Sequence, residues 1–459
     1  MNQTYDLTIG KIPPTILKFF FPMLFTNMLQ QIYSIADTII VGQGLGDSAL
    51  AAVGNMSSLT FLIIGFSIGL ANGFSVPIAH YYGAKNYTML RKTIATAIKL
   101  SFIASTILTI FSIHTLRNIL ILLQTDSSIL NDSLLYGYII FVGLITTMFY
   151  NLFACILRAL GNSKTPFIAI IISTIINILL NCVFIFVIGS GVEGVAIATV
   201  FSQIISTLIC FSKLRKIEFI NLTKTDFDSN VSITSELLKN GIPMALMNSI
   251  TAVGCMVVQY FVNGLGVIYT SAYSVCSKYL NLFMQPACTA GYTMSAFTSQ
   301  NYGAKQYERI KEGLFVCLGI ALTTYVVLGG IMVFMPETLA RIMLTGEDSI
   351  QLASQFLPIC GIMIWSVDCL FVFRSGVQGM GKPLIPMISG ILEMVMRISV
   401  IVLYVERYAF YATAYAEIMA WLAALTLNFI AFQFFLRRAL NKSSTETTKC
   451  FLILRKQRM

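Results

Sequence analysis

Long apolar runs separated by short polar segments make up almost the whole chain. A helix that crosses the hydrocarbon core of a bilayer needs about 20 consecutive, mostly apolar residues. Twelve runs are long enough. They cover about residues 15–41, 49–79, 93–123, 133–158, 165–189, 192–213, 234–263, 268–298, 312–336, 351–378, 384–405 and 409–436. The last two are the least distinct, because only the segment VERYAF divides them.

These runs predict helices rather than strands. Lipid offers the backbone no hydrogen-bond partners, so only α-helices and closed β-barrels span a membrane. Barrel strands alternate apolar and polar residues, whereas the runs here are continuous. Hydrophobic residues make up 56% of the chain and charged residues only 11%, although a soluble domain carries about 25% charged residues. We expect an all-α polytopic membrane protein with twelve transmembrane helices.

Basic residues are distributed unequally between alternate loops. If the N-terminus is cytoplasmic, most of the 30 Lys and Arg residues fall in cytoplasmic segments. The exceptions are Arg117, Arg341 and Arg407 in outer loops and Lys99, Lys278 and Arg397 within runs. Because cytoplasmic loops are enriched in Lys and Arg, both termini are predicted to lie on the cytoplasmic side of the cell's inner membrane. The net charge of +10 is spread over many short loops, so we expect no nucleic-acid partner.

The sequence also contains an internal repeat. Three pairs of segments match in the same order at an offset of 220 or 221 residues. These pairs are LKFFFPM (17–23) with LKNGIPM (238–244), YYGAKNY (81–87) with NYGAKQY (301–307), and GNSKTP (161–166) with GKPLIP (381–386). The chain therefore consists of two halves of about 220 residues with six helices each.

Because six is even, both halves enter the membrane from the same side, as parallel repeats. We expect an N-lobe over 1–213, a cytoplasmic linker over 214–233, a C-lobe over 234–436 and a basic cytoplasmic tail over 437–459. Many transporters are built from such repeats, with a substrate path between the halves and alternating access.

The repeated Gly-Ala-Lys element follows the second and eighth runs. Gly83 and Gly303 are expected to end these helices in the left-handed conformation. Lys85 and Lys305 would then lie at the level of the lipid headgroups.

Asp37 lies inside the first apolar run. An Asp at the centre of a transmembrane helix costs about 2.5–3.5 kcal/mol, and such residues usually face the bundle interior or a water-filled cavity. Asp37 is thus either a structural partner of a neighbouring helix or a carboxylate that gains and loses a cation during transport. The second half has Val257 or Val258 at the equivalent position. The scaffold therefore does not need an acid there, and this favours a cation site in the first half.

The second half offers secondary candidates. Asp368 lies in the tenth run, and Glu393 precedes Arg397 by four residues in the eleventh. This spacing and order favour a helical ion pair, so we expect Glu393 and Arg397 to be a structural pair. Lys278 in the eighth run could pair with an acid that the sequence does not identify.

Several segments resemble the multidrug and toxic compound extrusion (MATE) family. They are ADTIIVGQGLGDSALAAVG (36–54), LRALGNSKTP (157–166), NILLNCVFIF (177–186), GVAIATVFSQ (194–203) and the repeated NYGAK-type turn. The resemblance extends from about residue 12 to 436 and implies secondary active transport. A cation, H⁺ or Na⁺, moves down its gradient while an organic compound is exported. No ATP is implied, and the chain has no G-x-x-x-x-G-K-[ST] loop.

The resemblance also implies partners for Asp37. In the family, an Asn on the fifth helix is followed four residues later by an Asp, and a Thr on the sixth lines the same pocket. Asn177 and Thr199 match this pattern, whereas Asn181 replaces the Asp. Asn181 keeps an oxygen but loses a charge, which leaves the choice between H⁺ and Na⁺ and the stoichiometry open. Na⁺ would require converging oxygens from Asp37, Asn177, Asn181 and Thr199.

Other functional classes fit the sequence less well. A lipid-linked saccharide flippase of the same superfamily would carry several cationic residues in the first-half cavity, and these runs hold almost none. The sequence contains no enzymatic constellation, so we expect neither an enzyme nor a cofactor. The 21 Met and 33 Phe residues would give an adaptable apolar wall, which suits drugs and toxic organic compounds that are apolar, aromatic and often cationic. The two-lobed plan can function as a monomer.

Overall fold

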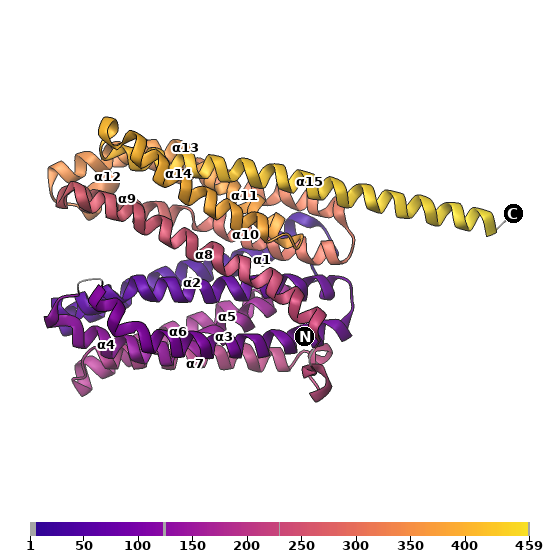
Figure 1. The fold of residues 1–459 in the computed structure, drawn as a ribbon, viewed down its shortest axis with the longest axis horizontal. Helices are drawn as coiled ribbons and strands as arrows, with labels where there is room; N and C mark the ends of the chain where they lie inside the picture. The colour runs from indigo at the N-terminus through magenta and orange to yellow at the C-terminus, as the bar shows by residue number, and fades with distance from the viewer. Residues whose placement is uncertain (1–5, 123–124, 229, 458–459) are drawn as a thin grey trace. The chain divides into compact units, whose positions relative to one another are not determined.

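The computed structural model describes residues 6–122, 125–228 and 230–457, and nearly all of them are helical (Figure 1). The first-half runs form α1 (Ile12–Leu45), α2 (Asp47–Gly83), α3 (Tyr87–Leu122), α4 (Ser127–Val142), α5 (Leu144–Ala159), α6 (Lys164–Cys182), the π-helix η1 (Val183–Ile188) and α7 (Val192–Arg215). Two 3₁₀ turns follow, η2 (Glu218–Ile220) and η3 (Lys224–Phe227). The second-half runs form α8 (Val231–Leu265), α9 (Val267–Phe283), α10 (Gln285–Gly303), α11 (Tyr307–Phe334), α12 (Pro336–Met343), α13 (Glu347–Gly379), α14 (Leu384–Tyr408) and α15 (Tyr411–Gln457).

The helices reproduce the expected spans. Within the described residues, ten helices are long and apolar enough to cross a membrane, and α4 with α5, bent by 45°, makes an eleventh. The expected span 268–298 is divided into α9 and α10 at Met284. One boundary was weak in the sequence, that between the last two runs. Ala409, with φ of 44°, separates α14 from α15 there. Helix α15 continues to Gln457 through the predicted tail, whose last two residues lie outside the described ranges.

The expected left-handed glycines at the Gly-Ala-Lys elements are wrong. The residues with positive φ are Lys85 (54°) and Lys305 (57°), two positions after each glycine. Gly83 is required for a different reason. A Cβ at Gly83 would lie 2.0 Å from the carbonyl oxygen of Gln300, so only glycine permits this approach of two backbones.

The described chain divides into two compact units. The first contains Lys18–Tyr82 and Asn86–Ser249, and the second contains Asp6–Leu17, Gly83–Lys85 and Ile250 onward. The start of α8 therefore packs in the first unit. A Cβ at Gly73 of α2 would lie 2.4 Å from the carbonyl oxygen of Asn240, so α2 and α8 cross with their backbones nearly in contact, as small residues permit between membrane helices.

The start of the chain packs in the second unit. Leu7 is buried; its N–H donates to Gln300 Oε1 at 2.9 Å, and its carbonyl accepts from Asn301 Nδ2 at 3.2 Å. Arg309 Nη1 donates to the carbonyl of Gly10 at 3.0 Å. The segment before α1 is thus held by α10 and α11 through backbone groups, which ties the beginning of the chain to the second half.

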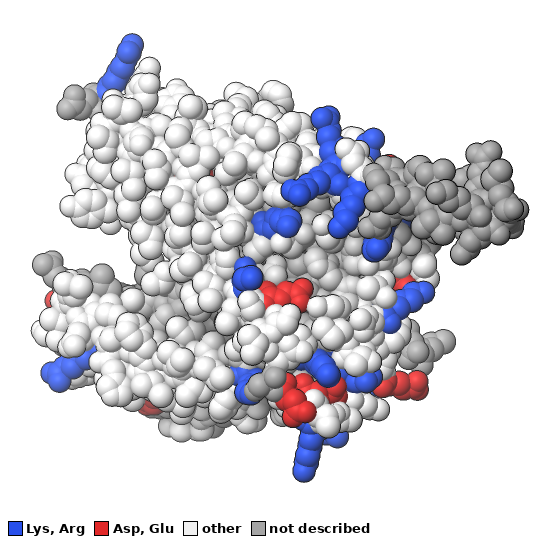
Figure 2. Space-filling model, turned by 45° about the vertical axis from the view of Figure 1, so that its right-hand side comes forward, with Lys and Arg blue, Asp and Glu red and all other residues white. Residues whose placement is uncertain are grey.

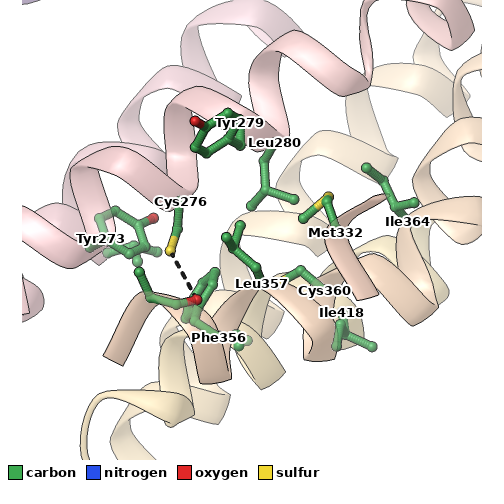
Figure 3. Packing of buried hydrophobic residues seen from close by; sticks show 14 of the residues in the cluster. Tyr273, Cys276, Tyr279, Leu280, Met332, Phe356, Leu357, Cys360, Ile364 and Ile418 are labelled. Atoms are coloured by element: carbon green, nitrogen blue, oxygen red, sulfur yellow. Dashed lines mark hydrogen bonds between the residues drawn. The ribbon is translucent and has the colours of Figure 1, made fainter. Parts of the chain in front are cut away.

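The core of the second unit is a cluster of buried apolar side chains from α8, α9 and α11 to α15. Figure 3 labels residues of this cluster on α9, α11, α13 and α15. Tyr273 meets Phe356 edge to face with ring centroids 6.1 Å apart, and Cys276 Sγ donates to the carbonyl of Ala353 at 3.9 Å.

The surface is also largely apolar. Figure 2 shows a face on which most atoms belong to uncharged residues. Many exposed side chains, including Phe61, Phe111 and Val326, are large and hydrophobic. Such a surface is stable in lipid rather than in water.

Candidate cation-coupling site

The first compact unit contains a polar cluster at the level of Asp37. Asp37 lies on α1, and its carboxylate Oδ1 accepts a hydrogen bond of 2.6 Å from Asn181 Nδ2 on α6. The same Nδ2 also donates to Asn177 Oδ1 at 3.0 Å, one turn earlier on α6. The i, i+4 spacing of the two asparagines therefore places both side chains on the face of α6 that meets α1.

Thr199 on α7 extends the cluster. Asn177 Nδ2 donates to Thr199 Oγ1 at 3.4 Å, and the Tyr33 hydroxyl lies 3.4 Å from the same Oγ1. Tyr33 precedes Asp37 by one turn of α1, and sequence reasoning missed it. The i, i+4 spacing from Asp37 was the signal that could have identified it. The four residues expected at the site, Asp37, Asn177, Asn181 and Thr199, all lie in this cluster.

The cluster combines buried amides with a partly buried acid. Asn181 is 0% exposed and Asn177 is also buried, whereas Asp37 and Thr199 are only partly buried. Asn181 Oδ1 is buried and has no hydrogen-bond partner among the described residues. A carboxylate beside an unpaired amide oxygen and a hydroxyl is a donor set for a proton or a hard monovalent cation. No three His, Cys, Asp or Glu side chains within the described ranges converge as a metal site.

The backbone next to the cluster is irregular. The α-helical hydrogen bonding of α6 ends at Cys182, one residue after Asn181, and continues as the π-helix η1 to Ile188. Gly189, with φ of 74°, ends this segment. Short π-helical segments occur frequently at functional sites. The apolar pattern gave no sign of this change.

The second compact unit holds a different polar cluster. Glu393 on α14 forms an ion pair with Arg374 on α13, and Glu393 Oε2 lies 3.6 Å from Arg397 Nη2. Arg397 donates to Glu417 Oε2 on α15 from Nε at 3.1 Å and from Nη2 at 3.0 Å. All four side chains are buried. We call Arg374, Glu393, Arg397 and Glu417 the Arg–Glu ladder.

The expected ion pair between Glu393 and Arg397 is confirmed as a contact, but it is the longest link of the ladder. Sequence reasoning missed Glu417 and placed Arg374 in a cytoplasmic segment, although both lie within apolar runs. The rule that singled out Asp37 would have found them, because an ionisable residue inside a run is a functional or paired residue by default.

The other two second-half candidates lie outside the ladder. Asp368 on α13 is 2% exposed, and its Oδ1 has no hydrogen-bond partner within the described part of the chain. Lys278 on α9 is exposed, and no ion pair joins it to an acid of the described residues.

Comparison with known proteins identifies the class. The MatE family model matches residues 22–183 and 243–405, one match in each half of the repeat. The chain belongs to the MatE family, whose members are membrane transporters coupled to ions, so the resemblance drawn from the sequence is confirmed and the expectation of a transporter rather than an enzyme holds.

Individual relatives agree with this assignment. The probable multidrug resistance protein YoeA of Bacillus subtilis is 31% identical over 382 residues, covering 80% of this chain and 81% of YoeA. The probable multidrug resistance protein YpnP of the same organism is 26% identical over 89% of this chain and 90% of its own. A crystal structure of a MATE protein in the bent conformation matches with a TM-score of 0.91 at 20% identity, over 97% of this chain and 99% of that one. The twelve-helix, two-repeat fold is therefore confirmed.

Proposed function

We propose that this chain is a secondary active exporter that expels lipophilic, often cationic organic compounds in exchange for H⁺ or Na⁺. The observation that carries the proposal is the contact between Asp37 and Asn181, which sets an ionisable group among buried amides inside a membrane-spanning bundle. The names of YoeA and YpnP support drugs and other toxic compounds as the substrate class.

Asp37 is the group that exchanges the cation. Asp37 is only partly buried, while Asn177 and Asn181 on α6 are buried. Loading with a cation neutralises the carboxylate, and this removes the main cost of closing apolar surroundings around it. The loaded and empty states thus favour different conformations, and differential affinity of that kind is what couples an ion to a conformational change.

The two possible coupling ions make different demands on Asn181. A proton needs only the carboxylate oxygen of Asp37. Na⁺ needs several oxygens, but Asn181 presents its Nδ2 to Asp37, and its Oδ1 is the unpaired atom. Na⁺ coupling would therefore require the amide of Asn181 to turn, with Asn177 and Thr199 contributing further oxygens.

The arrangement in the cell follows the same proposal. The N-lobe (1–213) and C-lobe (234–436), joined by the linker 214–233, alternate access to the two sides of the inner membrane, and both termini are cytoplasmic. A monomer suffices for this cycle.

Asp368 is the second candidate for cation exchange, because its buried oxygen lacks a partner among the described residues. Glu393, Arg397 and Lys278 are ranked after it.

The test is transport in liposomes loaded with a fluorescent lipophilic cation. A pH gradient and a Na⁺ gradient are imposed separately on wild type, Asp37→Asn and the control Asp228→Asn, whose carboxylate is exposed in the segment between α7 and α8. We expect one gradient to drive transport in wild type and Asp228→Asn but not in Asp37→Asn. Full activity of Asp37→Asn would contradict the role of Asp37 and move attention to Asp368. Failure of all three proteins under both gradients would favour a lipid-linked saccharide flippase.

A further inference from the structure

The Arg–Glu ladder lies on the repeat counterparts of the helices that build the Asp37 site. Helix α6 begins at Lys164 and α14 at Leu384, 220 residues later, so Arg397 takes the position of Asn177. In the first half, Asn177 contacts Thr199 on the following helix, α7. In the second half, Arg397 contacts Glu417 on the following helix, α15. The two polar clusters are therefore equivalent elements of the repeat.

The third helix of each cluster corresponds as well. Asp37 lies on α1, and the offset of 221 between LKFFFPM and LKNGIPM places Val258 of α8 at its position. Arg397 extends toward α8, because a Cβ at Gly254, one turn before Val258, would lie 3.4 Å from Arg397 Nη1. Nη1 itself has no hydrogen-bond partner among the described residues. The guanidinium thus faces the helix on which a valine replaces the acid.

The charges of the two clusters differ in one respect. Among the described residues, the first-half cluster contains one carboxylate and no cationic side chain. The second half offers two carboxylates, Glu393 and Glu417, with the Arg397 guanidinium between them and Arg374 on the far side of Glu393. Because two arginines balance two glutamates, the ladder needs no ion from solution.

We infer that Glu393 and Glu417 form a monovalent-cation site in the second half and that Arg397 fills it permanently as a tethered cation. The guanidinium is covalently attached, buried and held by the carboxylate of Glu417 through two nitrogens. It can neither dissociate nor lose its proton. Combined with the proposed function, on which this consequence rests, only the first of the two equivalent clusters exchanges an ion, so the pair of clusters carries a single coupling ion per cycle.

The test removes the Arg397 side chain and adds free guanidinium in its place. Purified Arg397→Ala protein is incubated with radiolabelled guanidinium, and equilibrium binding is measured beside wild type. We expect wild type to bind none at this site, because it is already filled. Arg397→Ala should bind one guanidinium per chain and gain thermal stability from it.

A matched control shows whether the ladder carboxylates hold the ion. Arg397→Ala/Glu417→Gln keeps the same cavity with one carboxylate fewer, and guanidinium should bind it at least about tenfold more weakly, as the loss of a charge-assisted bond predicts. No binding to folded Arg397→Ala, or equal binding to the double variant, would overturn the inference. So would binding to wild type that disappears in Glu417→Gln.

The result is independent of the proposed transport function. Guanidinium binding is repeated in Asp37→Asn/Arg397→Ala, where we expect it unchanged even if transport is absent for other reasons. If Arg397→Ala does not fold, Arg397→Lys provides the second measurement. In this variant the lysine ammonium takes the place of the guanidinium as the tethered cation. Arg397→Lys should fold and bind no guanidinium, and guanidinium binding to folded Arg397→Lys would overturn the inference.

Discussion

The two halves of this chain place polar side chains on equivalent helices and use them differently. The cluster around Asp37 contains two amides and two hydroxyls, and one amide oxygen remains unpaired. Around Arg397 the partners are two carboxylates. The first cluster can change its charge by one without breaking an ion pair. The second cannot, because removing either charge leaves its partner buried and uncompensated.

Because of this difference, we expect the ladder to contribute to stability and the Asp37 site to contribute to transport. Membrane-buried charges are tolerated when they are paired or functional. The ladder satisfies the first condition and the Asp37 site the second. Replacing an acid by its amide should therefore reduce mainly the stability in the second half and mainly the coupled transport in the first half.

The largest effect is expected in the second half. Glu417→Gln removes the carboxylate that receives two hydrogen bonds from Arg397. Breaking a buried ion pair on one side typically costs about 3–5 kcal/mol, and we expect a loss of that size in stability. Thermal unfolding in detergent measures it. An unchanged melting temperature would mean that the ladder contributes nothing and that the comparison between the halves fails.

The next effect concerns Asn181. Asn181→Leu keeps the approximate size but removes the hydrogen bond of 2.6 Å to Asp37. A hydrogen bond to a charged group contributes about 1.5–3 kcal/mol, or roughly tenfold or more in affinity.

The direction of the Asn181→Leu effect identifies the ion. Because the amide donor stabilises the ionised carboxylate, its loss should tighten proton binding, whereas the loss of an oxygen ligand should weaken Na⁺ binding. The measurement is the ion concentration at half-maximal transport. Asn177→Leu, which does not contact Asp37 directly, should shift this value less than Asn181→Leu if the ion is H⁺, and should also weaken binding if the ion is Na⁺, because it removes an oxygen ligand.

A smaller effect is expected for the stability of Asp37→Asn. The substitution keeps a hydrogen-bond acceptor for Asn181 and removes no ion pair. We therefore expect the free energy of unfolding to change by less than about 1 kcal/mol, while coupled transport is lost. Unfolding and transport are measured on the same preparation. A destabilisation as large as that of Glu417→Gln would make Asp37 a structural residue.

The smallest effect is expected for Thr199→Val. Both contacts of Thr199 Oγ1 in the cluster, to Asn177 and Tyr33, are long at 3.4 Å. Losing them should cost no more than about 1 kcal/mol in cation affinity. Transport should continue at a somewhat higher ion concentration. Complete loss would show that the hydroxyl binds the ion directly.

Much of this organisation was predictable from the sequence. The apolar runs predicted the helices, the internal repeat predicted the two halves, and the energetic cost of a buried acid identified Asp37 as a candidate. Periodicity also placed Asn177 and Asn181 on one face, but only the resemblance to the family connected that face with Asp37. A single helix does not reveal which neighbour it meets, so the contact of Tyr33 with Thr199 and the link from Arg397 to Glu417 required the structure. The π-helix after Asn181 and the break at Met284 have no counterpart in hydropathy, because they are changes of backbone hydrogen bonding within apolar sequence.

The most direct test of the account is the release of the coupling cation when substrate binds. A lipophilic cation is added to the purified protein, and the proton or Na⁺ released into weakly buffered solution is counted per chain. We predict one cation released by wild type and none by Asp37→Asn. The release of one cation by folded Asp37→Asn would contradict the account, because the exchangeable site would then lie outside the first-half cluster.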